Sequence, residues 1–356
     1  MGQLWPAATR QLRQGDSART GAARRPDEAL HDRRSRLQRW HQQMVGRSAR
    51  FVAALEQAAI VCDLDVHVLL SGESGTGKTQ LARLIHEASP RGRGPFVQVN
   101  CATLPETLVE SELFGAAAGA HSTARVPILG KIAAARHGTL FLDEVGELPL
   151  AAQAKLLQFL QCGEYYPLGS PRPCTADVRV ISASNVDLHA AVFERKFRAD
   201  LLYRLEVMPI RLPSLAERTE DIQALAELFC RRAADKHRLG PVRLSPAAIG
   251  AVLASSWPGN ARQLEHAVEA AVIRAAGAGR PEVEVEHLFP PGLSRTQCGG
   301  TTFQEATRSF QAGFLERALI DSGWNVSECS RRLELARSHA YTLIREFGLQ
   351  RREEPC

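Results

Sequence analysis

Short apolar runs alternate with amphipathic segments over residues 44–215. Runs rich in Val, Ile, Leu and Phe occupy residues 66–70, 96–100, 139–142 and 178–181, and each has the length of one buried strand. A segment with helical periodicity, residues 79–88, follows the first run after a glycine-rich turn. Because strands that alternate with helices form parallel sheets with helices on both faces, the pattern predicts an α/β fold.

The rest of the chain is helical or polar in pattern. We predict a helical lid without a convincing strand over residues 216–289, a Pro- and Gly-containing linker over 290–301, and a small all-α domain over 302–356. Residues 1–43 are rich in Arg, Ala, Gln and Asp with little apolar periodicity, which predicts a basic tail that is disordered or loosely helical. Such a tail is either a solvated arm or a contact for an acidic partner or nucleic acid.

Composition narrows the class of protein. Hydrophobic residues make up 44% and charged residues 23%, as in globular proteins. The sequence has no run of about 18 apolar residues and no secretory signal, so we expect a cytoplasmic protein without a membrane partner. The net charge of +5 belongs to residues 1–45, which carry nine arginines against four acids. Eight cysteines without a C-x-x-C pair indicate free thiols, not a zinc site.

The turn after the first strand carries a phosphate-binding pattern. Its residues are Gly72, Glu73, Ser74, Gly75, Thr76, Gly77, Lys78 and Thr79, which match the Walker A pattern G-x-x-x-x-G-K-[ST]. Glycines let backbone N–H groups curl around phosphates, and the following helix presents its positive N-terminus to them. Lys78 is predicted to contact the β- and γ-phosphates of ATP, and the Thr79 hydroxyl to bind magnesium.

Two acids end the third apolar run. Asp143 and Glu144 follow residues 139–142, and the carboxyl ends of parallel strands line the crevice where ligands bind. We predict that Asp143 holds magnesium and that Glu144 polarises the attacking water as a general base. Asn185 follows the next strand, where it either contacts the water or the γ-phosphate or simply forms a turn.

Further segments extend this pattern over residues 45–289. In order they read LVESELFG, GTLFLDEVGELPLAAQAKLLQFLQ, FRADLLYRL, LPSLAERTEDI and WPGNARQLE. Together with the phosphate loop they resemble the central AAA+ domain of the sigma-54-dependent activators, the bacterial enhancer-binding proteins. The resemblance implies a parallel P-loop sheet with a helical lid, ATPase activity, and assembly into a homo-oligomeric ring, which in this family is a hexamer.

The resemblance also implies roles for matching positions. Asn100 matches the residue that holds the Walker B glutamate, Asn185 matches sensor I, and Arg262 matches sensor II on the lid. Arg198 and Arg204 match arginines that reach the ATP site of a neighbouring subunit. A guanidinium there would meet the charge that phosphoryl transfer spreads over the γ-oxygens. Without the family pattern, the same two arginines would be interpreted as surface ion pairs.

The loop with which this family contacts sigma-54 is altered. In place of GAFTGA the chain has, without a gap, Gly119, Ala120, His121, Ser122, Thr123 and Ala124. His121 replaces the aromatic anchor, Ser122 keeps a hydroxyl, and Thr123 replaces a glycine and so restricts the backbone. We therefore expect an ATPase with a weakened contact to RNA polymerase holoenzyme that carries sigma-54.

The C-terminal segment resembles the Fis-type helix-turn-helix that ends these activators. Asn325 can cap a helix over residues 326–333, and a second helix is predicted over 337–347, with Glu334 in place of the turn glycine. The second helix would enter the major groove of double-stranded DNA. Its predicted DNA contacts are Arg337, Ser338, His339, Thr342 and Arg345. The apolar positions upstream, a core or a dimer seam, are Phe303, Ala306, Phe310, Phe314 and Leu319.

Three functions are compatible with these features. The first is an ATP-dependent, DNA-binding transcription activator of the sigma-54 type. The second keeps DNA and ATP binding but does not engage sigma-54, as in a repressor or an activator that acts through another sigma factor. The third is an AAA+ protein remodeller with an adaptor bundle at its C-terminus. The altered loop separates the first from the second, and the helix-turn-helix separates both from the third.

Overall fold

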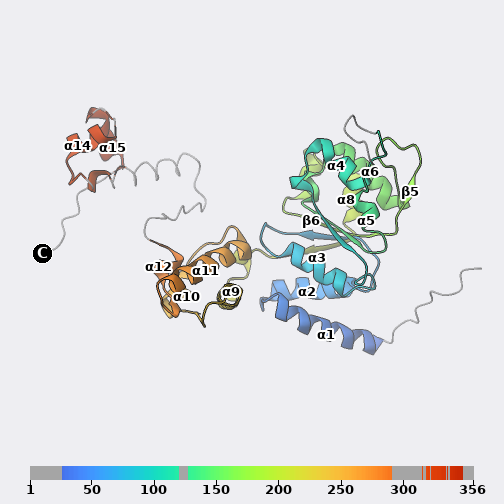
Figure 1. The fold of residues 1–356 in the computed structure, drawn as a ribbon, viewed down its shortest axis with the longest axis horizontal. Coiled ribbons are helices and arrows are strands. Elements are labelled where there is room, and N and C mark those ends of the chain that lie inside the picture. Colours follow the sequence, from blue (N-terminus) through green and yellow to red (C-terminus); the bar gives the residue numbers. More distant parts are fainter. Residues whose placement is uncertain are drawn as a thin grey trace, which may run out of the picture. The chain divides into compact units, whose positions relative to one another are not determined.

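The computed structural model describes residues 26–119 and 127–290, and residues 315–347 except 316, 317, 321, 334 and 336. The chain divides into two compact units, Met1–Leu288 and Phe289–Cys356 (Figure 1). In the part of the chain so described, no helix is long and apolar enough to cross a membrane.

A five-stranded parallel sheet forms the centre of the first unit. Its strands are β1 (Val68–Ser71), β2 (Phe96–Asn100), β3 (Thr139–Asp143), β6 (Arg179–Ser184) and β7 (Met208–Arg211), in the order β2-β3-β6-β1-β7. The four predicted strands and the α/β class are confirmed. The edge strand β7 was not predicted, because its apolar run is interrupted by Pro209. Proline is tolerated in edge strands, where one side of the backbone makes no ladder hydrogen bonds.

The two faces of the sheet are covered by different helices (Figure 1). Along β3, Phe141 packs in one core with α1 (Pro26–Gln43), α2 (Ala49–Val61) and α3 (Lys78–Glu87). Leu140 and Leu142 pack in the other core, with α4 (Glu106–Phe114), α6 (Leu150–Cys162) and α8 (Ala199–Leu205). This alternation follows from the strand's period of two. The smaller elements are η1 (Cys101–Thr103), α5 (Lys131–Ala134), η2 (Val145–Glu147), β4 (Glu164–Tyr165), β5 (Cys174–Thr175) and α7 (Leu188–Phe193).

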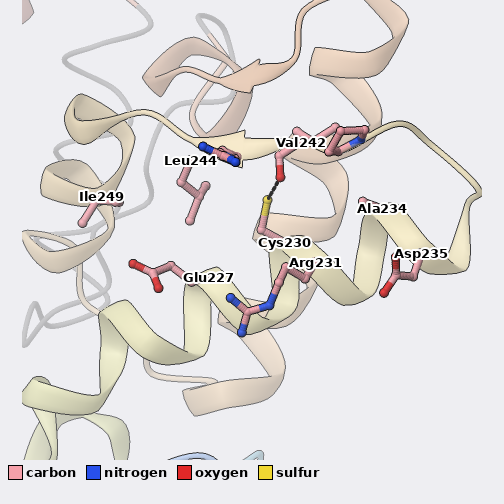
Figure 2. Close-up of a pocket in the computed structure, with 10 residues that line it drawn as sticks. Glu227, Cys230, Arg231, Ala234, Asp235, Val242, Leu244 and Ile249 are labelled. Atoms are coloured by element: carbon pink, nitrogen blue, oxygen red, sulfur yellow. Dashed lines mark hydrogen bonds between the residues drawn. The ribbon is translucent and has the colours of Figure 1, made fainter.

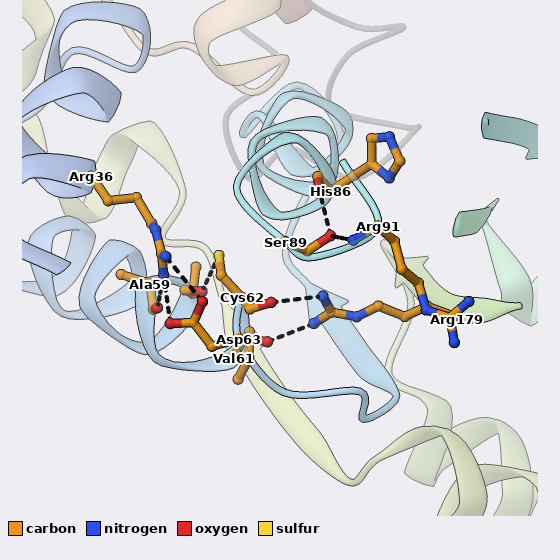
Figure 3. Close-up of polar contacts among 10 residues, drawn as sticks. Arg36, Ala59, Val61, Cys62, Asp63, His86, Ser89, Arg91 and Arg179 are labelled. Carbon is orange, nitrogen blue, oxygen red and sulfur yellow. Dashed lines mark hydrogen bonds and ion pairs between the residues drawn. The ribbon is translucent and has the colours of Figure 1, made fainter. Parts of the chain in front are cut away.

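Helix α1 (Pro26–Gln43) occupies much of the predicted tail, so residues 26–43 follow the helical alternative of that prediction. Trp40 and Met44 are buried against α2 and α3. The buried Arg36 guanidinium donates to the carbonyl of Ala59 at 2.9 Å and pairs with Asp63 at 3.1 Å (Figure 3). Few residues of α1 are apolar, so its largely polar and charged sequence gave only a weak helical pattern.

A helical lid follows the sheet. Its elements are η3 (Leu215–Glu217), η4 (Thr219–Asp221), α9 (Ile222–Lys236), α10 (Pro246–Leu253), α11 (Asn260–Gly277) and α12 (Val285–Leu288). The expectation of no strand was wrong, because β8 (Arg243–Leu244) pairs in parallel with β9 (Glu282–Val283). Strands of two residues are too short to show a period. A cavity of about 560 Å³ lies between α9 and β8, where the buried Cys230 thiol donates to the Val242 carbonyl (Figure 2).

The second unit contains α14 (Val326–Arg332) and α15 (Arg337–Phe347), close to the two predicted helices. The Asn325 side chain caps α14 by accepting from the N–H groups of Ser327 and Glu328, as predicted. Leu319 and Cys329 are buried between the helices. Most of the predicted linker lies outside the described residues, as do Phe303, Ala306, Phe310, Phe314 and the turn residue Glu334.

Candidate nucleotide-binding site

The predicted phosphate loop connects β1 to α3 and can be built only from glycine at its tightest points. Gly72 has a φ of +148° and Gly75 a φ of +79°, in the region that side chains disfavour. A Cβ atom at Gly72 would lie 2.6 Å from the carbonyl oxygen of Leu212, and one at Gly75 would lie 2.3 Å from that of Gly259. Neighbouring backbone therefore leaves no room for a side chain at these two positions of the predicted phosphate cradle.

Lys78 is the first residue of α3 and its side chain is buried. Its Nζ donates to the carbonyls of Gly72 at 2.6 Å and Glu73 at 3.1 Å. Burial lowers the pKa of Lys78, while the carboxylates of Glu144 and Asp143 act in the opposite direction. The ammonium is thus bonded to the loop and interacts electrostatically with the two acids at the end of β3.

Thr79 and Asp143 meet although they are far apart in the sequence. The Thr79 hydroxyl donates to Asp143 Oδ2 at 3.2 Å. Asp143 ends β3, which pairs with β2 and β6 at the centre of the sheet. A hydroxyl and a carboxylate side by side are the hard oxygen ligands that magnesium prefers.

Glu144 follows β3 with a φ of +55°, a left-handed conformation that is uncommon outside glycine. Its Oε2 accepts from the backbone N–H of Asn185 at 3.1 Å. Because β3 and β6 are neighbours, their carboxyl ends bring these two residues together. Burial raises the pKa of Glu144, and the Lys78 charge opposes that rise.

Asn100 ends β2 and lies in register with Asp143. Its Oδ1 accepts from the N–H of Ala102 at 3.0 Å and so caps η1. The carboxylate of Glu144 is bonded to Asn185 instead. Asn100 therefore reaches the site that the resemblance implies, with Ala102 as its partner in this structure.

One cavity of about 330 Å³ is lined by Lys78, Thr79, Asn100, Asp143 and Glu144. The lid contributes Arg262, whose Nη1 donates to the Ser74 hydroxyl at 3.2 Å. It also contributes Arg232 of α9 and Glu265 of α11, which were not predicted. A basic residue on the polar face of a helix has the same sequence pattern as a solvated one, so no signal marked Arg232.

A second cavity, of about 340 Å³, lies where the segment before α2 meets the lid. Its lining includes Val45, Gly46 and Arg47 on one side and Asp221 on the other. The Asp221 carboxylate accepts from the N–H groups of Arg47, at 2.7 Å, and Ser48. The short segment before α2 was not predicted to contribute to a site.

Arg198 and Arg204 are not among the described residues that line the 330 Å³ cavity. The Arg198 guanidinium makes two hydrogen bonds with Asp200, at 3.0 and 2.8 Å, and its side chain is 42% exposed. Arg204 donates from Nε and Nη2 to the carbonyl of Leu160. In this structure the two guanidinium groups are thus bound by Asp200 and by the Leu160 carbonyl.

The altered loop begins at Gly119, which has a φ of +81° and no neighbouring atom that a Cβ would meet within 4 Å. Ala120, His121, Ser122, Thr123 and Ala124 lie outside the described residues. Below the loop, Ala116 pairs with Ile128 through two backbone hydrogen bonds of 3.0 and 2.9 Å. That bridge closes the base of the loop.

The predicted DNA contacts lie on α15. Arg337, Ser338, Thr342 and Arg345 are exposed, and the Thr342 hydroxyl donates to the Ser338 carbonyl at 3.0 Å. His339 belongs to α15, but its side chain is outside the described part of the structure. Exposed residues at these spacings share one face of a helix.

Comparison with known proteins identifies the family to which residues 44–302 belong. Residues 44–211 match the family model of the sigma-54 interaction domain, and residues 216–302 match that of the AAA+ ATPase lid domain. The anaerobic nitric oxide reductase transcription regulator NorR of Citrobacter koseri is 42% identical over 320 residues, which are 86% of this chain and 63% of that protein. The chain thus spans less than two thirds of that relative.

Solved structures show the same fold. NtrX from Brucella abortus in complex with ATP is 31% identical with a TM-score of 0.67, over 91% of this chain and 74% of that one. The Hsp104:casein complex of S. cerevisiae is 18% identical with a TM-score of 0.52, over 72% and 48% of the two chains, and bears on the fold alone.

The parallel sheet, the phosphate loop and the helical lid define an AAA+ nucleotide-binding protein. Within that class, the chain belongs to the family of sigma-54-dependent transcriptional activators.

Replacing Gly75 should weaken nucleotide binding. Gly75→Ala forces a Cβ towards the Gly259 carbonyl at a positive φ, a strain on the order of 1–3 kcal/mol. The shift of the unfolding midpoint by ADP measures the affinity, because ligands stabilise the state that they bind. Gly250→Ala, inside α10 with no atom within 4 Å of its built Cβ, is the matched control and should be neutral or stabilising by about 0.5–1 kcal/mol. Equal behaviour of the two variants would contradict the assigned cradle.

Proposed function

We propose that this chain hydrolyses ATP with magnesium and uses the energy to regulate transcription, as an activator of the sigma-54 type. The observation that carries the proposal is the convergence of Lys78, Thr79, Asp143 and Glu144 on one cavity beside the lid arginines. Charge-neutralising and water-activating groups are the requirements of phosphoryl transfer.

The residues present fit a magnesium ion. Thr79 Oγ1 and Asp143 Oδ2 lie 3.2 Å apart, and both are hard oxygen donors at the edge of the phosphate cradle. When bound, the ion would neutralise charge on the phosphate oxygens. Lys78 would bind the β- and γ-phosphates, and Arg262 would contact the nucleotide from the lid.

Glu144 is the proposed general base. Its carboxylate lies in the cavity and is oriented by the Asn185 N–H, which places the acid at the junction of two strand ends. Asn185 would contact the attacking water or the γ-phosphate, and Asn100 would exchange Ala102 for Glu144 in another nucleotide state. Both roles rest on the family pattern together with their places at the ends of β6 and β2.

Glu144→Gln should bind ATP but hydrolyse it slowly. The amide keeps the shape of the side chain and removes the base, so kcat should fall by about 10²–10⁴-fold while nucleotide affinity changes little. Steady-state phosphate release measures this effect. Glu147→Gln, in η2 three residues on, makes the same change outside the cavity and should retain normal turnover. Undiminished turnover in Glu144→Gln would refute its assignment as the base.

A homo-oligomeric ring, a hexamer in this family, is the proposed active unit. Arg198 and Arg204 lie outside the cavity of their own chain, as arginines that act on a neighbour require. Two large apolar side chains near them are exposed, Phe193 at 91% and Tyr203 at 76%. Exposed apolar groups beside a functional arginine are typical of a surface that a partner covers.

Mixing two inactive variants should restore hydrolysis. Arg198→Ala leaves its own Lys78 and Glu144 intact, and Glu144→Gln leaves its Arg198 intact. Some sites of a mixed ring therefore contain every group, and phosphate release should recover partly. Mixing Lys78→Ala with Glu144→Gln is the control without recovery, because each chain then damages its own site. Absence of recovery in the first mixture, with rings formed, would argue against action on a neighbour.

Double-stranded DNA is the proposed partner of the second unit. The exposed face of α15 carries Arg337, Ser338, Thr342 and Arg345, and guanidinium groups bind guanine edges and phosphates. The Asn325 cap and the buried Leu319 and Cys329 hold α14 and α15 as a helix pair. Residues 301–356 carry equal numbers of acids and arginines, so binding would depend on base contacts more than on net charge.

The altered loop favours a second candidate, a regulator that binds DNA and ATP but engages sigma-54 weakly or acts through another factor. His121 is more polar than the family's phenylalanine, and Thr123 restricts a backbone position that the family leaves to glycine. The match to the sigma-54 interaction domain favours the first candidate. The loop decides between them.

We expect the native loop to support little open-complex formation with sigma-54 holoenzyme on a sigma-54 promoter. The triple variant His121→Phe, Ser122→Thr, Thr123→Gly should raise the open-complex yield without changing ATP turnover, because it restores the family's aromatic and glycine. Permanganate footprinting of the melted promoter measures the yield, with Glu144→Gln as the control that cannot drive the reaction. Strong activation by the native loop would identify an ordinary activator.

A further inference from the structure

The turn between α10 and α11 packs directly on the phosphate loop. Asn260, the first residue of α11, is 1% exposed and has a φ of +54°. Asparagine adopts this left-handed conformation more readily than other side chains except glycine. The side chain of Asn260 is therefore held in one place by a buried backbone of unusual conformation.

A single amide at Asn260 joins the lid to the loop. Its Oδ1 accepts from the N–H of Leu215 at 2.6 Å, in the first turn of the lid. Its Nδ2 donates to the Glu73 carboxylate at 2.9 Å and to the Ser74 carbonyl at 3.0 Å. The acceptor faces the lid and the donors face the loop, so a carboxylate or a hydroxyl cannot make the same set of bonds.

Glu73 carries this contact towards Lys78. While its carboxylate binds Asn260, its carbonyl accepts from Lys78 Nζ at 3.1 Å and from the Thr76 hydroxyl at 2.9 Å. A displacement of α11 would therefore move the residue that positions the Lys78 ammonium. Asn260 is not among the residues that line the 330 Å³ cavity, so its influence on a nucleotide would pass through Glu73 and Ser74.

We propose that Asn260 is a positioning residue, which couples the lid to the phosphate loop through Glu73 and Ser74 and so sets the affinity of the site for nucleotide. This inference rests on the proposed ATP-binding function. Arg262 also reaches Ser74, but from an exposed side chain, whereas the Asn260 amide is enclosed by its partners.

The test is Asn260→Asp, measured by calorimetric titration with magnesium-ADP and by steady-state ATP hydrolysis. The variant keeps the acceptor for Leu215 N–H and replaces the donor with an oxygen that faces the Glu73 carboxylate. We expect the Kd for ADP and the KM for ATP to rise at least tenfold. Adding Glu73→Gln supplies an amide donor opposite the new carboxylate, and we expect it to restore most of the affinity.

Two controls separate positioning from a loss of folding. Glu269→Gln changes an acid on the same helix, where it contacts Lys236 and His237, and should leave Kd and KM unchanged. The unfolding midpoint without nucleotide is measured for every variant. If Asn260→Asp weakens binding and Glu73→Gln restores it, the proposal is supported. If binding weakens together with a lowered unfolding midpoint and Glu73→Gln does not restore it, Asn260 has a structural role only.

The remaining outcomes distinguish this inference from the proposed function. If the native chain binds ADP and Asn260→Asp binds it equally well, the coupling is wrong and the proposed function stands. If the native chain binds ADP without hydrolysing ATP, the ADP titrations still decide the role of Asn260. If the native chain binds neither nucleotide, the proposed function fails and the coupling fails with it.

Discussion

Burial of the Lys78 ammonium is the constraint on which the nucleotide site depends. A charged group taken out of water costs several kcal/mol unless other groups replace its hydration. Here the carbonyls of Gly72 and Glu73 do so, and the acids Asp143 and Glu144 oppose the lowering of the Lys78 pKa that burial causes. The loop and the strand ends must therefore keep fixed positions, and the surrounding elements supply that rigidity.

A second buried cation holds the start of the lid to the same loop. Arg218 donates to the Thr76 carbonyl at 3.3 Å, and its guanidinium lies 4.5 Å from the ring centroid of Phe51 on α2. Burial lowers the pKa of Arg218, and the Asp221 charge opposes the change. Asp221 in turn accepts from the N–H groups that precede α2. The lid is thus attached to the loop and to the segment before α2 by buried polar contacts, which are costly to break singly.

The sequence predicts a functional residue best when that function requires neighbouring residues in the chain. The phosphate loop does, because successive backbone N–H groups must face one ligand, and five of its eight predicted residues line the 330 Å³ cavity. Asp143 and Glu144 were found because strand ends meet in a parallel sheet. Arg232 was missed because only the folded lid brings it to the cavity.

Misread elements have equally specific causes. Helix α1 gave only a weak signal because few of its residues, Leu37 and Trp40 among them, are apolar within an Arg-rich composition. The two-residue strands β8 and β9 are held by the lid that surrounds them, not by a pattern of their own. The partner of Glu144 in this structure, the N–H of Asn185, is a backbone group, and no side-chain signal can predict it.

A single buried side chain joins the segment that follows Glu144 to the N-terminus of α8, next to Arg198. Gln153 of α6 donates to the carbonyls of Leu148, just after η2, and of Lys196, and it accepts from the N–H of Arg198 at 2.9 Å. The segment that follows Glu144 and the turn that begins α8 are therefore fixed to each other. As at Asn260, a buried primary amide uses both its donor and its acceptor to join two segments that are distant in the sequence. A buried ion pair in the same place would have a larger desolvation cost.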